Sequence, residues 1–461
     1  MSLTGKKCGL KYEKKIAIWM LIFGLVMAFL IPTWQTPDEY THLSQIGSSI
    51  NNESFAGILN EKADVDTGRI IRNYDEKVDV NKLLDAMTAG ATYNKEDLMP
   101  KGISLSILKY LPSTIGGLVG AFCGVSAYWV LQFAEIFSLL FYVSVCYFAL
   151  KLMPIKKELF ALVMLMPMAL QQAGGIGYDA SLLSLCFFFI AYVFHLKFKD
   201  RIGWKDFIGL MAIWLIITYI KMPYCFLILL LFILPIDKIH LRIGKFEING
   251  RIIRKIRIPI CILGIVILAV GVYCLRNHYY INIVIGLFQE WRRTLYLLKE
   301  TVRNWSGMLI VSSVGNFGWL DTPIHYGVAV LVYVVIALSA MFNDDKKEDK
   351  KLTKWDVLVV WGTFFVLCLF TVFAMVNHTI MVNLFGSEWS DGTYNIRTAL
   401  YQIPYIGGLQ GRYFLPFVGL FFLPLPQLKH VSSKKMRIAF SAFELIVFGY
   451  IMYILLCRYW I

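Results

Sequence analysis

Seven residues from Thr36 to His42, with the sequence Thr-Pro-Asp-Glu-Tyr-Thr-His, directly follow the first hydrophobic segment of the chain. They place the carboxyl groups of Asp38 and Glu39 and an imidazole where a membrane surface would meet water. Charged groups are costly to hold there, so such a cluster indicates a functional site. A carboxylate in this position can act as a general base on a substrate hydroxyl, and the imidazole can orient it.

The same seven residues also fit a plain helix start. Pro37 suits the first position of a helix, which makes Thr36 the N-cap and Glu39 the third residue of a capping box. Asp38 is not needed for that cap, and it shares a helix face with His42 four residues later, so the two could orient one another. A divalent metal, if one binds, would be held by Asp38, Glu39 and His42. So few ligands make a weak metal pattern, and we predict no required cofactor.

The composition places these residues in a membrane protein. The chain has 461 residues, of which 58% are hydrophobic and only 16% are charged, whereas soluble domains have about 25% charged residues. The formal net charge is +14, but the Lys and Arg residues lie in short loops between apolar segments, as membrane topology requires. We therefore expect membrane lipids and no nucleic acid as partners, and an all-α integral membrane protein with a single polytopic domain over residues 1–461.

Apolar segments long enough to cross the hydrocarbon layer, which takes about 20 residues in a helix, recur along the chain. Eleven transmembrane helices are predicted, near residues 16–32, 126–150, 158–174, 179–196, 204–220, 223–236, 257–275, 324–342, 355–375, 411–428 and 438–457. Residues 105–123 are apolar but contain Lys109 and Pro112. We interpret them as an interfacial or re-entrant helix, because a further span there would place the basic segments 151–157 and 197–205 outside.

This assignment puts 28 of the 45 Lys and Arg residues in inner loops, which predicts a cytoplasmic N-terminus and an extracytoplasmic C-terminus. Three outer segments are large, at residues 33–125, 276–323 and 376–410. We expect amphipathic helices in them, as a small cap at 51–101 and as a surface helix at 281–303. In the interior of the spans only Glu135 and Glu444 are acidic, which favours a one-sided site over an ion relay across the membrane.

Two more motifs fall on the same outer face. The glycine-rich turn at residues 174–179 ends in Tyr178 and Asp179, and its glycines would let the backbone approach a ligand closely. Asp179 could equally be the N-cap of a helix that begins at Ala180. Lys221, in the sequence Lys-Met-Pro-Tyr, ends an apolar segment on the outer side, where it could bind an anion or extend to lipid headgroups.

The last two motifs begin later spans from the same side. Residues 316–323 contain Trp319 and Asp321; the first could be an interface anchor, and Asp-Thr-Pro could be a plain helix start. Arg412 and Tyr413 lie at the start of the segment near 411–428. A guanidinium group presents a planar fork that suits phosphate, although a lone arginine at an interface often only extends to headgroups.

The chain contains five motifs that resemble, in the same order, those of a bacterial multi-spanning membrane family, domain of unknown function 2142. They are TPDEYTH, GYDASLL, KMPY, GWLDTPI and QGRYFLP. The resemblance covers about residues 16–428. The family usually has PPDE or PDEPAH, so Thr36 replaces the first proline and Tyr40-Thr41 replaces Pro-Ala, while the polar residues are kept. The family in turn resembles the GT-C superfamily of membrane glycosyltransferases, which implies a GT-C-like fold in the bacterial plasma membrane.

GT-C enzymes use a polyprenyl-phosphate-linked sugar donor on the outer face and carry an acidic residue just after the first span, where Asp38 and Glu39 stand. The resemblance therefore implies a glycosyltransferase that moves a sugar to a cell-surface glycan or a lipid-linked acceptor, with an extracytoplasmic active site. We expect Asp38 or Glu39 to be the base and His42 to orient it. Substrate and phosphate are expected to contact Tyr178, Asp179, Lys221, Trp319, Asp321, Arg412 and Tyr413.

The same residues leave other functions open. A polysaccharide polymerase or ligase would use the same lipid phosphate on the same side. A flippase for lipid-linked oligosaccharides would be a transporter, and it should show cations on both sides of a central cavity. A non-catalytic assembly subunit would need the acidic cluster only as a helix cap.

Overall fold

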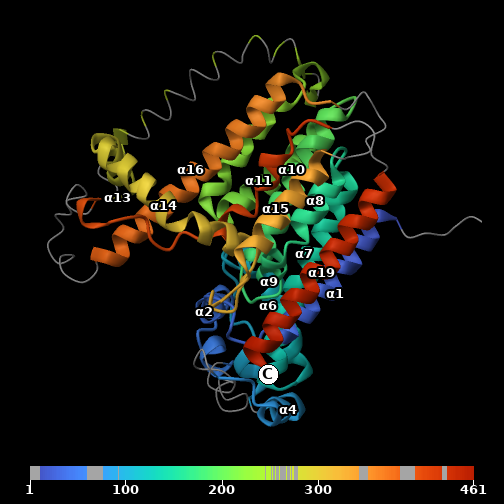
Figure 1. Ribbon diagram of the computed structural model, residues 1–461, viewed down its shortest axis with the longest axis vertical. Helices are drawn as coiled ribbons and strands as arrows, with labels where there is room; N and C mark the ends of the chain where they lie inside the picture. Colours follow the sequence, from blue (N-terminus) through green and yellow to red (C-terminus); the bar gives the residue numbers. More distant parts are fainter. Residues whose placement is uncertain are drawn as a thin grey trace, which may run out of the picture.

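The computed structural model describes residues 11–59, 76–91, 93–243, 246–250, 279–341, 351–384, 400–427 and 433–461, with isolated positions between 252 and 274. These residues are mostly helical (Figure 1). The first half contains α1 (Tyr12–Leu30), α2 (Glu39–Ser49), α4 (Val80–Thr88), α5 (Lys95–Leu98), α6 (Ile107–Cys123), α7 (Ala127–Leu152), α8 (Lys157–Met164), α9 (Pro167–Ala173), α10 (Asp179–Phe198) and α11 (Trp204–Ile220).

The second half begins with two 3₁₀ helices. Its elements are η1 (Met222–Ile233), η2 (Ile236–Lys238), β1 (His240–Ile243), β2 (Phe246–Asn249), α13 (Tyr279–Gln289), α14 (Trp291–Val314), β3 (Asn316–Phe317), β4 (Thr322–Pro323), α15 (Tyr326–Met341), α16 (Lys354–Leu384), η4 (Gly411–Phe414), α18 (Gly419–Phe422) and α19 (Ser433–Tyr459). Both strand pairs are antiparallel, β1 with β2 and β3 with β4.

Four helices in the described part of the chain are long and apolar enough to cross a membrane: Ala127–Leu152, Asp179–Phe198, Lys354–Ile380 and Lys435–Tyr459. Three shorter apolar helices are Ile107–Cys123, Met222–Ile233 and Tyr326–Met341. A mostly helical membrane protein is therefore confirmed, whereas eleven spans and a GT-C-like fold stay predictions. The span predicted at 257–275 lies almost wholly outside the described residues.

Two predicted spans are broken by proline. The segment at 158–174 forms α8 and α9, separated by Leu165 and Met166, and Met166 has extended backbone angles. Pro167 explains this break, because proline disfavours helical angles in the residue before it. The segment at 411–428 forms only η4 and α18. Pro416, Pro424 and Pro426 lie in this segment, and each removes a backbone donor that a continuous helix needs.

The core lies around α7, α9 and α10. In α10, 67% of the most apolar 18-residue window is buried inside the protein, against 22% in α16. Phe187, Phe189 and Phe194 of α10 are fully buried. α16 exposes Leu358 and Phe365, as expected for a helix that faces lipid, since lipid tails are as apolar as these side chains.

The helix α6 packs along α7 through small residues. A Cβ on Gly116 would lie 2.2 Å from the carbonyl oxygen of Phe133, and one on Gly120 would lie 2.9 Å from the Cα of Val130. Such close contact between helix backbones is typical of membrane proteins. Residues before α6 bond to Ser49 at the end of α2, and Lys95 of α5 donates to Phe122 O at its other end. Both ends of α6 therefore contact the first loop, and an interfacial or re-entrant position for this helix stays a prediction.

The helices α1 and α19 run side by side in parallel (Figure 1). Trp460 Nε1 donates a hydrogen bond to Leu30 O at 2.9 Å, so the C-terminal ends of both helices lie together. Figure 1 shows α2 and α4 at this end as well, near the C-terminus. We call it the first-loop end.

Segments predicted as inner loops meet at the opposite end of the molecule, where α1 and α19 begin. Ion pairs join them: Lys157 with Glu13 (2.8 Å), Arg437 with Glu158 (2.5 Å) and Lys197 with Asp356 (2.6 Å). Each of these ion pairs joins two segments predicted on the same side, and the orientation of the chain stays a prediction. The amphipathic helices predicted in the first loop are also present, as α4 and α5, while residues 60–75 of that loop lie outside the described residues.

Candidate functional site

The loop between α1 and α2 has unusual backbone angles. Trp34 and Asp38 have φ of 72° and 68°, in a left-handed region that side chains other than glycine rarely adopt. Such strain persists only where surrounding contacts hold it, and it clusters at functional sites. Three contacts anchor this loop, at Trp34, Thr36 and Asp38, and each leads to a different segment of the chain.

Glu39 forms the central anchor. Its side chain is buried, and its carboxyl oxygens accept hydrogen bonds from Thr36 N and Ile176 N, both at 3.3 Å. The bond to Thr36 is the predicted half of a capping box, but α2 begins only at Glu39, so the predicted helix start at Pro37 is wrong. The left-handed Asp38 prevents the helix from starting earlier. Glu39 thus joins the α1–α2 loop to the glycine-rich turn at residues 174–178, where Gly175 lies against it.

Burial raises the pKa of Glu39 from 4.5 to about 7, because removal from water disfavours the charged form. The folded protein therefore holds this proton more tightly than the unfolded chain. The resulting stabilisation is complete below about pH 4.5 and is lost as the pH rises to about 7, with a size on the order of 3 kcal/mol.

We expect thermal unfolding at constant ionic strength to show this loss of stability in the wild type. Glu39→Gln should flatten the profile over that window, and the exposed Glu53→Gln should not; an unchanged profile in Glu39→Gln would contradict the assignment.

Asp38 faces the other way. Its side chain is 62% exposed, and its Oδ2 lies 3.6 Å from Nη2 of Arg412, whose side chain is only 8% exposed. At this distance the two charged groups form an ion pair, but their atoms are too far apart for a hydrogen bond. The two adjacent carboxyl groups therefore have different environments. Asp38 is available to a substrate beside a buried cation, whereas Glu39 holds two loops together.

Gln172 connects Arg412 to Asp179. With its amide oriented so that both ends are satisfied, the nitrogen donates to Asp179 Oδ2 at 2.8 Å and the oxygen accepts from Arg412 Nη1 at 3.1 Å. Asp179 is the first residue of α10, after Tyr178 as the N-cap, and no capping bond from the Tyr178 side chain is formed. The predicted N-cap role of Asp179 is therefore wrong. The negative charge of Asp179 still stabilises the N-terminal end of α10, because it interacts favourably with the helix dipole.

Lys221 completes a group of cations and aromatic rings. Its Nζ lies 4.5 Å from the ring centre of Tyr413 and 5.7 Å from that of Tyr178, while the Arg412 guanidinium lies 5.5 Å from the Tyr413 ring. Burial lowers the pKa of Lys221, and the Asp179 charge opposes that shift. Lys221 is only partly exposed and folds over these rings, so it does not simply extend to lipid headgroups.

The Arg412 turn is fixed from two sides. Gly411 N donates to Ser312 Oγ of α14 at 2.7 Å, and a Cβ at Gly411 would lie only 2.0 Å from Leu309 O. Tyr224 Oη donates to Tyr413 O at 2.8 Å. A cavity of about 10 Å³ lies among Gln172, Asp179, Leu182, Leu183, Lys221, Tyr224, Arg412, Tyr413 and Pro416.

His42 bonds to a partner that we did not predict. Its Nδ1 lies 3.4 Å from Tyr110 Oη, and its ring packs edge-on to Tyr178 at 4.9 Å. Burial lowers the pKa of His42, which favours the neutral ring. Among the described residues no side-chain hydrogen bond joins His42 to Asp38, because the left-handed Asp38 precedes the helix face that the prediction assumed. The predicted orientation of Asp38 by His42 is therefore not supported.

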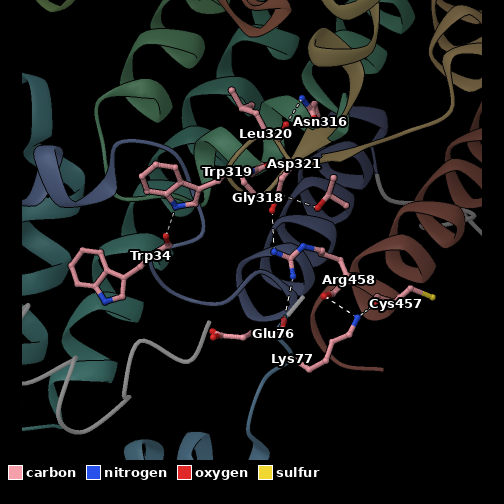
Figure 2. Close-up of polar contacts among 12 residues, drawn as sticks. Trp34, Glu76, Lys77, Asn316, Gly318, Trp319, Leu320, Asp321, Cys457 and Arg458 are labelled. Atoms are coloured by element: carbon pink, nitrogen blue, oxygen red, sulfur yellow. Dashed lines mark hydrogen bonds and ion pairs between the residues drawn. The ribbon is translucent and has the colours of Figure 1, made fainter. Parts of the chain in front are cut away.

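Trp319 and Asp321 belong to a separate cluster (Figure 2). Trp319 Nε1 donates to Trp34 O at 2.6 Å, and Asp321 Oδ2 pairs with Arg458 Nη2 at 3.0 Å. Lys77 donates to the Cys457 and Arg458 carbonyl oxygens, where a cation caps the C-terminal end of α19. This cluster attaches the C-terminus to the first loop.

The hairpin that carries Trp319 and Asp321 is not a helix start. Thr322 and Pro323 pair with Phe317 and Asn316 as β4 and β3, and α15 begins only at Tyr326. The predicted surface helix at 281–303 is present but divided, as α13 and α14 with a break at Glu290.

Replacing Asp321 with asparagine tests this separation. Arg458 would keep a buried charge without its carboxylate, which we expect to lower the free energy of unfolding by about 3 kcal/mol. Because Asp321 lies in the Arg458 cluster, any activity at Asp38 should be unchanged once the folded fraction is taken into account. Denaturant titration gives the first quantity. A folded Asp321→Asn protein without activity would instead place Asp321 in the substrate site.

Some contributors were missed in the sequence. Gln172 and its neighbour Gln171 are polar residues in an apolar stretch, which is the signal that could have identified them. Tyr110 lies in a segment that we considered only for topology. No group of three or more His, Cys, Asp or Glu side chains suited to a metal occurs among the residues that the structure describes, and Glu39, Asp38 and His42 each contact a different partner.

Comparison with known proteins supports a family assignment. Residues 21–421 match the model of a family described as "Predicted membrane protein (DUF2142)". The chain belongs to this family. No curated protein and no solved structure matches the chain.

The family match covers all five motifs completely, including the one around Arg412. It includes α1 from Leu21 and all the residues that surround Asp38 and Arg412. It ends before α19, so the Arg458 cluster lies partly beyond the matched family region. The family description establishes a membrane protein and gives no reaction.

Proposed function

We propose that this protein is a glycosyltransferase of the bacterial plasma membrane, which moves a sugar from a polyprenyl-phosphate donor to a cell-surface glycan or lipid-linked acceptor. The observation that supports this most is the exposed Asp38 carboxylate beside the buried, fixed Arg412 guanidinium. Lys221 lies over the same Tyr413 ring as Arg412. An acid and two cations therefore converge at the first-loop end, which we assign to the extracytoplasmic side.

The chemistry needs both kinds of group. The acceptor hydroxyl attacks the anomeric carbon of the sugar and gives its proton to Asp38, while the bond from that carbon to the phosphate oxygen breaks. The polyprenyl phosphate leaves with one more negative charge than it had in the donor. Arg412 and Lys221 stabilise that charge, and preorganised cations act most strongly where charge develops. The loose 3.6 Å contact lets the phosphate replace Asp38 on Arg412.

The assignment of sides rests on charge. The loops predicted to be cytoplasmic hold 28 of the 45 Lys and Arg residues, and basic loops are retained in the cytoplasm. No nucleotide sugar is supplied outside the cell, so the donor there must be lipid-borne. A flippase is less well supported, because the acid and cations of the motifs gather at one end.

Purified protein in liposomes tests this proposal. Labelled polyprenyl-phosphate sugars are offered on the side of the first-loop end, with and without glycan acceptors. We expect loss of sugar from the lipid and, with the right acceptor, transfer to it. Movement of intact donor across the bilayer without bond cleavage would support the flippase and contradict the enzyme.

A further inference from the structure

A small polar cavity lies beneath the α1–α2 loop, apart from the surface where Asp38 meets Arg412. Its volume is about 10 Å³, close to the smallest space that holds one water molecule. It can therefore take only a ligand of about one atom. It is lined by Met27, Ala28 and Ile31 at the end of α1, Thr36 in the loop, Glu135 of α7, Gln171 of α9 and Gly174.

Within the described ranges, one buried acceptor without a donor lines this cavity, and a second, on Gln132, belongs to a side chain that bonds to Glu135 but is not in the lining. Gln171 Oε1 is buried and has no hydrogen-bond partner among the described residues, in a side chain that is 3% exposed. Glu135 is also 3% exposed, and it accepts one hydrogen bond, at 3.0 Å from Gln132 Nε2. The Oε1 of Gln132 is a second buried acceptor without a partner in this part of the chain. Buried polar atoms are normally satisfied, so these acceptors indicate a missing hydrogen-bond donor or cation.

The charges give the same indication. Glu39 and Glu135 are both buried, and they act on one another electrostatically as like charges. Among the described residues neither carboxylate forms an ion pair with a lysine, arginine or histidine. A buried charge is strongly unfavourable unless it is paired. The buried Glu135 carboxyl group and the unsatisfied Gln171 oxygen are separate observations: the first needs a cation or a proton, and the second needs a donor or a cation.

We propose that this cavity binds one small monovalent cation, of the size of sodium, between Glu135 and Gln171. A proton on Glu135 would neutralise the carboxylate and could donate to Gln171 Oε1, so protonation is the competing state, and it predicts a melting temperature that depends on pH and not on sodium. A magnesium ion would need octahedral coordination with several retained waters, for which the cavity is too small. Thr36 and Gly174 lie in the two loops next to Asp38 and Asp179, so the bound ion would hold these loops together.

Binding of ²²Na⁺ to purified wild-type protein, measured by scintillation proximity, tests this directly. We expect saturable binding of about one ion per chain that unlabelled sodium displaces better than potassium. The melting temperature should rise with the logarithm of the sodium concentration when N-methylglucamine keeps the ionic strength constant, because the ion binds only the folded state.

Variants separate this site from general effects of salt. Glu135→Gln and the milder Gln171→Leu should each lower ²²Na⁺ affinity at least tenfold and remove most of the sodium-dependent shift. Glu444→Gln, which changes a buried carboxyl group of α19, should leave both intact. No sodium binding to the wild type, equal binding by all three variants, or a melting temperature that responds to pH but not to sodium would overturn the proposal. None of these readouts depends on sugar transfer.

Discussion

Replacing Asp38 with asparagine is expected to lower the rate of sugar transfer by about 10²- to 10⁴-fold, the usual contribution of a general base. Asparagine has nearly the same shape and tolerates the left-handed backbone at this position. Because the Asp38 side chain is 62% exposed, the protein should stay folded and inserted in the membrane. The measurement is turnover of a labelled polyprenyl-phosphate sugar by equal amounts of folded protein.

Two controls make the Asp38 result specific. Glu96→Gln changes an exposed acid of α5 at the same end and should keep full activity. Glu39→Gln should lower activity less than Asp38→Asn, because its buried side chain holds loops rather than meeting the acceptor. Undiminished transfer by folded Asp38→Asn would remove Asp38 from the role of base.

Replacing Arg412 with lysine is expected to lower transfer by about 10²- to 10³-fold, as loss of a preorganised donor at a developing charge does. Lysine keeps the positive charge but loses the planar fork that reaches both Asp38 and Gln172. The backbone at this position is held by the Gly411 and Tyr413 contacts, so the turn should remain. The affinity for the polyprenyl phosphate product should fall as well.

The matched control is Arg458→Lys. Arg458 is a second buried arginine paired with an aspartate at the same end. Its replacement should cost stability without lowering the turnover of each folded molecule. If Arg412→Lys and Arg458→Lys reduced transfer equally, the Arg412 effect would be a loss of structure and not of phosphate binding.

The sequence allowed prediction of the residues that gather around Arg412. Asp38, Asp179 and Lys221 are separated widely in sequence, but each stands where an apolar segment meets a polar one. Membrane topology then brings such positions to one end, since charge is costly elsewhere in the span. The capping-box pattern distinguished Glu39 from Asp38 only as a candidate helix cap, because their different exposure depends on the packing of the turn at 174–178.

Other features of the structure could not be predicted because they depend on contacts between segments that are distant in the sequence. Asp321 pairs with Arg458, and no local pattern links a residue of the β3–β4 hairpin to the end of the chain. The predicted spans at 158–174 and 411–428 were judged by hydrophobicity alone, whereas Pro167 and Pro416 interrupt the backbone there. The roles of Gln171 and Gln172 follow from burial, which a sequence of neighbouring apolar residues only suggests.

The most direct test is photo-crosslinking of the purified protein with a diazirine analogue of polyprenyl phosphate, followed by mass spectrometry of the labelled peptides. The phosphate is predicted to bind at the first-loop end, so label that polyprenyl phosphate displaces should fall on residues 34–42 and 411–416. A cavity of about 730 Å³ at the other end, between α1, α8 and α19, provides the contrasting position. Displaceable label confined to that cavity, with none near Asp38 or Arg412, would contradict the proposed site.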